Sequence, residues 1–157
     1  MKLVVEYLQR EREPQVLINR VILPWASAKL PGLLTRAQQK SIVEEALSKQ
    51  QADGGFSLSA FVGGWRRRDS TPLETKSDGY ATGVVAFVLP QACVPRDRVE
   101  MTKALDWLRH NQDANEGRWL AYSLNKQRDL SSDVGRFMSD AGYGVRCDGA
   151  RVHQLTR

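Results

Sequence analysis

The sequence predicts an all-α protein built as an open arc of about three helical hairpins. A helix, a glutamine, a short polar loop, a glycine and an aromatic residue follow one another twice, and the two glutamines, Gln51 and Gln112, stand 61 residues apart. A second landmark, a serine–aspartate pair, occurs at residues 77–78 and again at 139–140, 62 residues later. Two nearly equal offsets indicate a repeated unit of about 61 residues, which favours a stack of similar helical pieces.

The first hairpin is expected near the N-terminus. Residues 16–28 form an apolar stretch that predicts a helix, with Pro24 as a kink or a boundary. After a proline–glycine pair, a second helix is expected over residues 35–51, where Thr35 is a typical N-cap. Gln38 stands three residues after Thr35 and completes a capping-box pattern.

The second hairpin pairs an interior helix with an exterior one. Residues 80–89 are apolar nearly all round, so their helix should be buried on most sides, with Asp78 as N-cap and Pro90 and Pro95 ending it. Residues 96–111 carry apolar side chains on one side only, which predicts a helix at the surface. This alternation is what a closed ring of helical hairpins requires.

A third hairpin starts near residues 132–140 and is not completed. From Gly142 onward the chain is rich in glycine and arginine and shows no helical stripe. We therefore expect one domain over residues 1–141 and an irregular tail over residues 142–157. A reading-frame shift or a truncated gene near Ala141 is one hypothesis for this change.

Charge and composition exclude several functions. The net charge of +5 comes from scattered residues, and its one dense cluster, residues 66–68, is followed at once by Asp69. This triplet is expected to be a solvated loop, with a phosphate or membrane-headgroup contact as the alternative. Aromatic residues are not interleaved with basic ones, so no nucleic-acid partner is expected.

No metal, cofactor or membrane span is expected. Cys147 and His153 are close in sequence, but two candidate ligands do not make a zinc site. No run of 18 apolar residues occurs, and Glu6 interrupts the only apolar stretch at the N-terminus, so neither a transmembrane helix nor a signal peptide is predicted. We expect a cytoplasmic protein, with a peripheral membrane contact left open.

The glutamine–glycine–aromatic units resemble the QW motifs of triterpene cyclases such as the squalene–hopene cyclases. That superfamily also includes the protein prenyltransferases and shares an (α/α) toroid. The units of this chain are Gln112, Gly117 and Trp119, and a second copy at Gln51, Gly55 and Phe56. The resemblance implies an incomplete (α/α) toroid in which each glutamine ties the end of an outer helix to the next loop.

The resemblance also implies a reaction, the intramolecular carbocation cyclisation of a hydrophobic polyprene by an isomerase or mutase. The D-x-D-D acid of these cyclases does not occur here, and Tyr80 stands where the prenyltransferases carry a zinc-binding cysteine. The chain is therefore expected to be a fragment or one half of a terpene-cyclase-like protein, completed by the rest of the toroid or by self-association. The alternative is a non-catalytic helical-repeat module that binds a lipid or a protein segment on its concave face.

Two aspartates and three aromatic residues are candidate site residues. Asp78 and Asp140 hold equivalent positions before inner helices, where an acid would need burial to raise its pKa, whereas N-cap hydrogen bonds would lower the pKa and favour capping. Tyr80, Phe87 and Trp65 could line a cavity and stabilise a carbocation through their ring faces, with core packing as the alternative.

Overall fold

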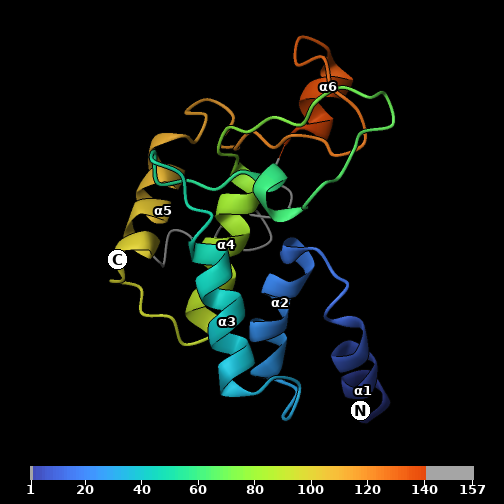
Figure 1. Cartoon of the computed structure of the whole chain (residues 1–157). Coiled ribbons are helices and arrows are strands. Elements are labelled where there is room, and N and C mark those ends of the chain that lie inside the picture. The colour runs from blue at the N-terminus through green and yellow to red at the C-terminus, as the bar shows by residue number, and fades with distance from the viewer. Residues whose placement is uncertain (1, 141–157) are drawn as a thin grey trace.

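The computed structural model describes residues 2–140, and their regular structure is entirely helical (Figure 1). Within this part of the chain the only strand-like feature is an isolated antiparallel bridge between Leu120 and Asp140. The all-α prediction is confirmed. The elements are α1 (Lys2–Glu11), α2 (Leu17–Ser27), α3 (Arg36–Leu47), the 3-10 helix η1 (Leu58–Phe61), α4 (Gly79–Gln91), α5 (Val99–His110) and α6 (Asp133–Met138).

Four helices form the body of the molecule. Helices α2 and α4 pack against each other, α3 packs on α2, and α5 packs on α4. Figure 1 shows α2 and α4 running in one direction and α3 and α5 returning in the other. Helix α4 buries residues around its circumference, whereas α5 buries only Met101, Ala104 and Leu108 on one side. The predicted alternation of an interior and an exterior helix therefore holds for α4 and α5.

Helix α3 begins as the sequence predicts. The Thr35 hydroxyl accepts the Gln38 N–H at 3.2 Å, and the Gln38 side chain accepts the Thr35 N–H at 2.9 Å, which completes the capping box. The helix ends at Leu47, four residues before the expected end at Gln51. The next residues turn back on the helix, with the Lys49 and Gln50 N–H groups donating to carbonyls of its last turn.

Both helical prolines lie inside their helices. Pro24 is within α2, which continues to Ser27, and Pro90 is within the last turn of α4, which continues to Gln91. The expectation that Pro90 ends its helix is wrong by one residue. A proline in the last turn removes a single N–H donor and leaves the following residue free to stay helical.

The core has two parts. The larger cluster joins α2, α3, α4, α5 and η1, and contains Phe56 and Phe61 packed edge to face with ring centroids 5.9 Å apart. A smaller cluster joins Ala86 of α4, Leu108 of α5 and Trp119 from the loop after α5. Each part of the core therefore contains an aromatic side chain from a long loop, Phe56 in the larger cluster and Trp119 in the smaller one.

Helix α1 was not predicted from the sequence. It buries none of its residues, and Leu3, Val4 and Tyr7 are exposed on it. Its Gln9 side chain donates to the Gly32 carbonyl at 2.7 Å. Leu3, Val4, Tyr7 and Leu8 recur at helical spacing, so the sequence did carry an apolar stripe that predicts this helix, although the stripe packs on no core.

The long loops gather at one end of the helices. Residues 48–78 and 111–132 lie at the end where α4 begins, whereas the short connections 28–35 and 92–98 lie at the opposite end (Figure 1). Both glutamine–glycine–aromatic units belong to the long loops. The candidate site is therefore at this end.

Candidate functional site

Gln51 links the loop after α3 to the segment that enters α4. Its side-chain amide donates to the Thr75 carbonyl at 2.5 Å, and its amide oxygen lies 3.0 Å from the Ser77 hydroxyl. Its backbone N–H donates to the Gly55 carbonyl at 2.9 Å, closing a tight loop. The glutamine therefore ties the loop after α3 to the segment that leads into α4.

Asp53 is the centre of this unit, and sequence reasoning missed it. Its Oδ1 accepts the Gly55 N–H at 3.0 Å and lies 2.8 Å from the Ser77 hydroxyl, and its Oδ2 accepts the Trp107 indole N–H at 3.0 Å. Ser77 has one hydroxyl proton, so it donates to either Asp53 or Gln51 at a time. Asp53 thereby joins three segments, and the signal in the sequence was its place just before the pair Gly54–Gly55.

Gly55 is required by close packing. A Cβ atom at this position would lie 2.6 Å from the Ser77 Cβ and 2.8 Å from the Trp107 indole nitrogen. Both distances are shorter than carbon atoms tolerate without displacement. The absence of a side chain at Gly55 therefore lets Trp107 of α5 reach Asp53.

Phe56 is fully buried and its backbone is held by the first turn of α4. Its N–H donates to the Thr82 hydroxyl at 2.9 Å, and its carbonyl accepts the Asp78 N–H at 2.9 Å. The aromatic residue of the first unit is thus fixed to the start of the inner helix.

The second unit uses its residues differently. The Gln112 side chain donates to the Gly117 carbonyl at 2.9 Å, within the same loop, and Gly117 has a φ of +63°. The Trp119 indole N–H donates to the Leu108 carbonyl near the end of α5 at 2.7 Å, and its ring is buried against Ala86 and Leu108. Here the tryptophan, not the glutamine, binds the end of the outer helix.

Asp78 caps α4 from a buried position. Its side chain accepts the Ala81 N–H at 2.9 Å and the Leu58 N–H at 2.5 Å, and the residue is 1 % exposed. Burial raises its pKa to about 6, against the lowering effect of the backbone hydrogen bonds from Ala81, Leu58 and Tyr80. The capping role holds, while desolvation outweighs the hydrogen bonds that were expected to lower the pKa.

Asp140 repeats part of this arrangement. Leu120 and Asp140 form an antiparallel bridge, and the Ala121 N–H donates to the Ser139 carbonyl at 2.8 Å. The Leu120 carbonyl also accepts the Gly79 N–H at 2.7 Å, so the segment at Leu120 connects the two serine–aspartate pairs. Asp140 follows α6, and the inner helix expected after it, like the tail over residues 142–157, lies outside the described residues.

The three aromatic candidates occupy separate places. Trp65 is 48 % exposed and donates its indole N–H to the Leu124 carbonyl at 2.9 Å, and Tyr80 is 42 % exposed in the first turn of α4. Phe87 packs edge-on against Trp25 of α2 with ring centroids 5.5 Å apart. Phe87 therefore acts as packing between the two inner helices.

A polar pocket lies between the two units. Its volume is about 330 Å³. Burial and the nearby carboxylates of Glu74 and Asp78 raise the pKa of its Tyr122 hydroxyl. Its mixed walls suit a small molecule with hydrogen-bonding groups. The lining residues are Gln51, Asp53, Lys76, Ser77, Trp107, Asn111, Leu120 and Tyr122.

The basic triplet at residues 66–68 is not a solvated loop throughout. Arg67 is 4 % exposed and donates to the Ser123 carbonyl at 2.9 and 2.7 Å and to the Pro72 carbonyl at 2.7 Å. It also pairs with Glu74. A buried guanidinium without partners is costly, and here a carboxylate and two carbonyls supply them. The triplet alone does not reveal which arginine turns inward.

Residues 2–140 contain no group of three or more histidine, cysteine, aspartate or glutamate side chains placed to hold a metal ion. In the same part of the chain, no helix has both the length and the apolar character needed to cross a bilayer. No family model, curated protein or solved structure matches the chain.

Proposed function

We propose that this chain is a section of a terpene-cyclase-like (α/α) toroid, a fragment or one half of a protein of the squalene–hopene cyclase type. The whole protein would cyclise a polyprene through an intramolecular carbocation rearrangement. The observation that carries the proposal is the pair of glutamine–glycine–aromatic loops. Each follows an outer helix, α3 or α5, and buries its aromatic residue, Phe56 or Trp119, against an inner one.

The helix order supports the toroid. Inner helices α2 and α4 run in the same direction, and each carries an outer helix that returns antiparallel to it. Continuing the order inner, outer, inner, outer would generate a ring. About three hairpins in repeats of about 61 residues would make an open arc of that ring, and α6 followed by Asp140 would start the third.

In this proposal the chain forms part of the wall of the toroid and does not supply the catalytic acid. Asp78 has a raised pKa, which an acid needs, but its carboxylate holds the N–H groups of Leu58 and Ala81. A carboxyl group committed to two backbone donors at a helix start is a cap. The proton donor for cyclisation would therefore come from another part of the toroid.

Incubation of the purified chain with squalene, followed by mass spectrometry, tests the proposal. We expect no cyclic product from the chain alone, and saturable binding of squalene by the whole toroid to which it belongs. Robust turnover of squalene by the isolated chain would overturn the proposal that the chain lacks the catalytic acid. A D-x-D-D motif in an adjoining segment of the reading frame would supply the missing acid.

A binding module is the second candidate, and the exposed side of α6 favours it. Val134, Phe137 and Met138 are all exposed on this six-residue helix. An apolar surface of this kind suits a lipid or an apolar protein segment. Binding of the isolated chain to lipid vesicles, without binding of squalene in solution, would select this function over the cyclase wall.

A further inference from the structure

Two loops far apart in sequence form one platform near Arg67. The Arg68 N–H donates to the Asn125 carbonyl at 3.0 Å, and the Gln127 N–H donates to Asp69 Oδ2 at 2.8 Å. The hydrogen bonds from Trp65 to Leu124 and from Arg67 to Ser123, described above, add further links. Several cross-links over a few residues hold the backbone of both loops in a fixed relation.

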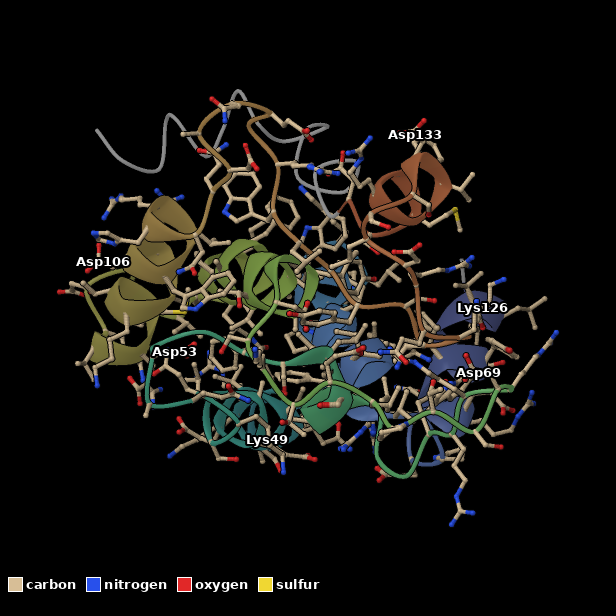
Figure 2. The ribbon with its side chains drawn as sticks, turned by 90° about the horizontal axis from the view of Figure 1, so that it is seen from above. Lys49, Asp53, Asp69, Asp106, Lys126 and Asp133 are labelled. Carbon is tan, nitrogen blue, oxygen red and sulfur yellow. The ribbon has the colours of Figure 1, made fainter. Side chains whose placement is uncertain are left out.

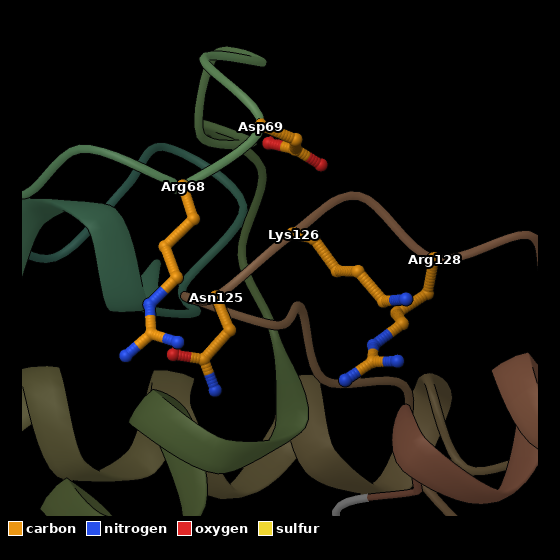
Figure 3. Close-up of a pocket in the computed structure, with 5 residues that line it drawn as sticks. All are labelled: Arg68, Asp69, Asn125, Lys126 and Arg128. Carbon is orange, nitrogen blue, oxygen red and sulfur yellow. The ribbon is translucent and has the colours of Figure 1, made fainter.

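Three cationic side chains gather on this platform. Arg68, Lys126 and Arg128 line a pocket of about 440 Å³ together with Asn125 and Asp69. Figure 3 shows the Lys126 amine beside the Arg128 guanidinium, and the Arg68 guanidinium beside the Asn125 amide. Figure 2 places Asp69 and Lys126 at one edge of the molecule, away from Asp53 and Asp106. The pocket is thus separate from the polar pocket between the two repeat units.

The charges of this pocket are not balanced within the described residues. No ion pair there involves Arg68, Lys126 or Arg128. The one carboxylate, Asp69, accepts the Thr71 N–H and O–H and the Gln127 N–H, and these hydrogen bonds lower its pKa. Its oxygens are therefore used to hold the loops, and three positive charges face one negative charge.

Arg128 has an unused donor. Its Nε atom is enclosed, and it has no hydrogen-bond acceptor among the described residues. Buried N–H groups in proteins nearly always have an acceptor. Because the atom is closed to water, a ligand oxygen reaches it only when the guanidinium turns, and such a turn would give this arginine the acceptor that it lacks among the described residues.

The donor set matches a phosphate group. Arginine presents parallel N–H donors that pair with two oxygens of a phosphate, and lysine adds a point charge. Two guanidinium groups, one ammonium group and the Asn125 amide suit the several oxygens and the double charge of a phosphomonoester. A carboxylate ligand has two oxygens and a single charge, and would leave donors unused.

We propose that the pocket formed by Arg68, Asn125, Lys126 and Arg128 binds a phosphomonoester group. The ligand is either a soluble phosphorylated molecule or a lipid whose headgroup is a phosphomonoester, such as phosphatidic acid. This site does not depend on the function proposed for the helical frame, because it uses only the two loops.

Titration of the full chain with inorganic phosphate, followed by NMR or calorimetry, tests the site. We expect saturable binding that Arg68→Gln and Arg128→Gln each weaken roughly tenfold or more, the loss expected for a charge-assisted pair of hydrogen bonds. Lys49→Gln is the matched control, since it removes one positive charge from an exposed side chain away from the pocket. Thermal unfolding confirms that each variant is folded, and Lys126→Gln, at an exposed side chain, replaces any variant that is not.

Vesicles distinguish the two sources of the phosphate. Recruitment to phosphatidic acid above charge-matched phosphatidylserine, lost on addition of free phosphate and in Arg128→Gln, assigns the site to a lipid headgroup. Saturable phosphate binding without that preference assigns it to a soluble ligand. The proposal is overturned if phosphate does not bind saturably, or if Lys49→Gln weakens binding as much as the pocket variants do.

Discussion

The two glutamine–glycine–aromatic units have the same order in sequence, but Gln51 and Gln112 make different contacts. In the first, the backbone N–H of Gln51 binds the Gly55 carbonyl, so its side chain is free to reach Thr75 and Ser77. In the second, the loop is one residue longer, and the side chain of Gln112 binds the Gly117 carbonyl instead. The first unit makes the matching side-chain bond from Gln50, which donates to the Gly54 carbonyl at 2.9 Å, and the second unit closes its backbone through the Asp113 N–H, which donates to the Arg118 carbonyl at 2.8 Å. In the structure, Gln50 therefore holds the place of Gln112, and Gln51 holds the place of Asp113.

The aromatic residues are what the two units share. Phe56 and Trp119 are both buried, and each packs beside the inner helix α4. Phe56 is held through its backbone by Thr82 and Asp78, whereas Trp119 is held through its indole N–H by Leu108. Burial of the ring is thus common to both units, and the hydrogen bonds that orient it are not.

The largest expected effect is loss of either ring. Phe56→Ala and Trp119→Ala should each lower the free energy of unfolding by about 3–5 kcal/mol, because each leaves a cavity in its cluster. Urea unfolding followed by circular dichroism measures this. Trp65→Ala, at a ring that is about half exposed, should cost about 1 kcal/mol or less and serves as control. If Trp119→Ala lowers the free energy of unfolding by less than Trp65→Ala does, the second unit does not seal a core.

The next effect concerns Asp78 and pH. Because its pKa is raised from 3.8 to about 6, the folded state holds the proton more tightly than the unfolded state does. The free energy of unfolding should therefore fall by about 3 kcal/mol as the pH rises from below 3.8 to above about 6. Asp78→Asn should remove this fall while lowering stability at low pH, since an amide offers one acceptor for two N–H donors.

The control for this pH dependence is Asp106→Asn. Asp106 is a partly exposed residue on α5 paired with Arg109, and its replacement should leave the fall in stability in place. Urea unfolding at a series of pH values compares the two variants with the wild type. If the free energy of unfolding of Asp78→Asn still falls by the full amount as the pH rises, another group causes the pH dependence.

Gly55 and Gly117 should differ in which substitutions they tolerate. Gly55→Ala should cost about 1–3 kcal/mol through overlap with Ser77 and Trp107. Gly117→Ala should cost about 1–2 kcal/mol because of its left-handed φ, and Gly117→Asn should recover part of that cost, since asparagine adopts this conformation more readily. The same substitution to asparagine at Gly55 should be worse than alanine. Thermal unfolding of the four variants is the measurement.

The smallest effect should come from the glutamines. Gln51→Ala should cost about 1 kcal/mol, because it removes hydrogen bonds to both Thr75 and Ser77. Gln112→Ala should cost about 0.5 kcal/mol or less, since its one described hydrogen bond is exposed. Equal costs in urea unfolding would contradict the different roles assigned to the two side chains.

Features that depend on neighbouring residues could be predicted from the sequence. The Thr35–Gln38 capping box, the Asp78 cap and the buried helix of residues 79–91 all follow from residues within a few positions of one another. The omission of Asp53 has a physical cause too. Asp53 acts through Ser77 and Trp107, which are 24 and 54 residues away, whereas α1 carries an apolar stripe at Leu3, Val4 and Tyr7 from which it could have been predicted.

The sequence by itself determined the helical class and the interior and exterior character of α4 and α5, because helix periodicity and capping are local. Only the tertiary structure decided the pKa of Asp78, the burial of Arg67 and the gathering of Arg68, Lys126 and Arg128. Desolvation and charge clustering depend on which segments meet in space, and the loops that meet here are separated by more than fifty residues.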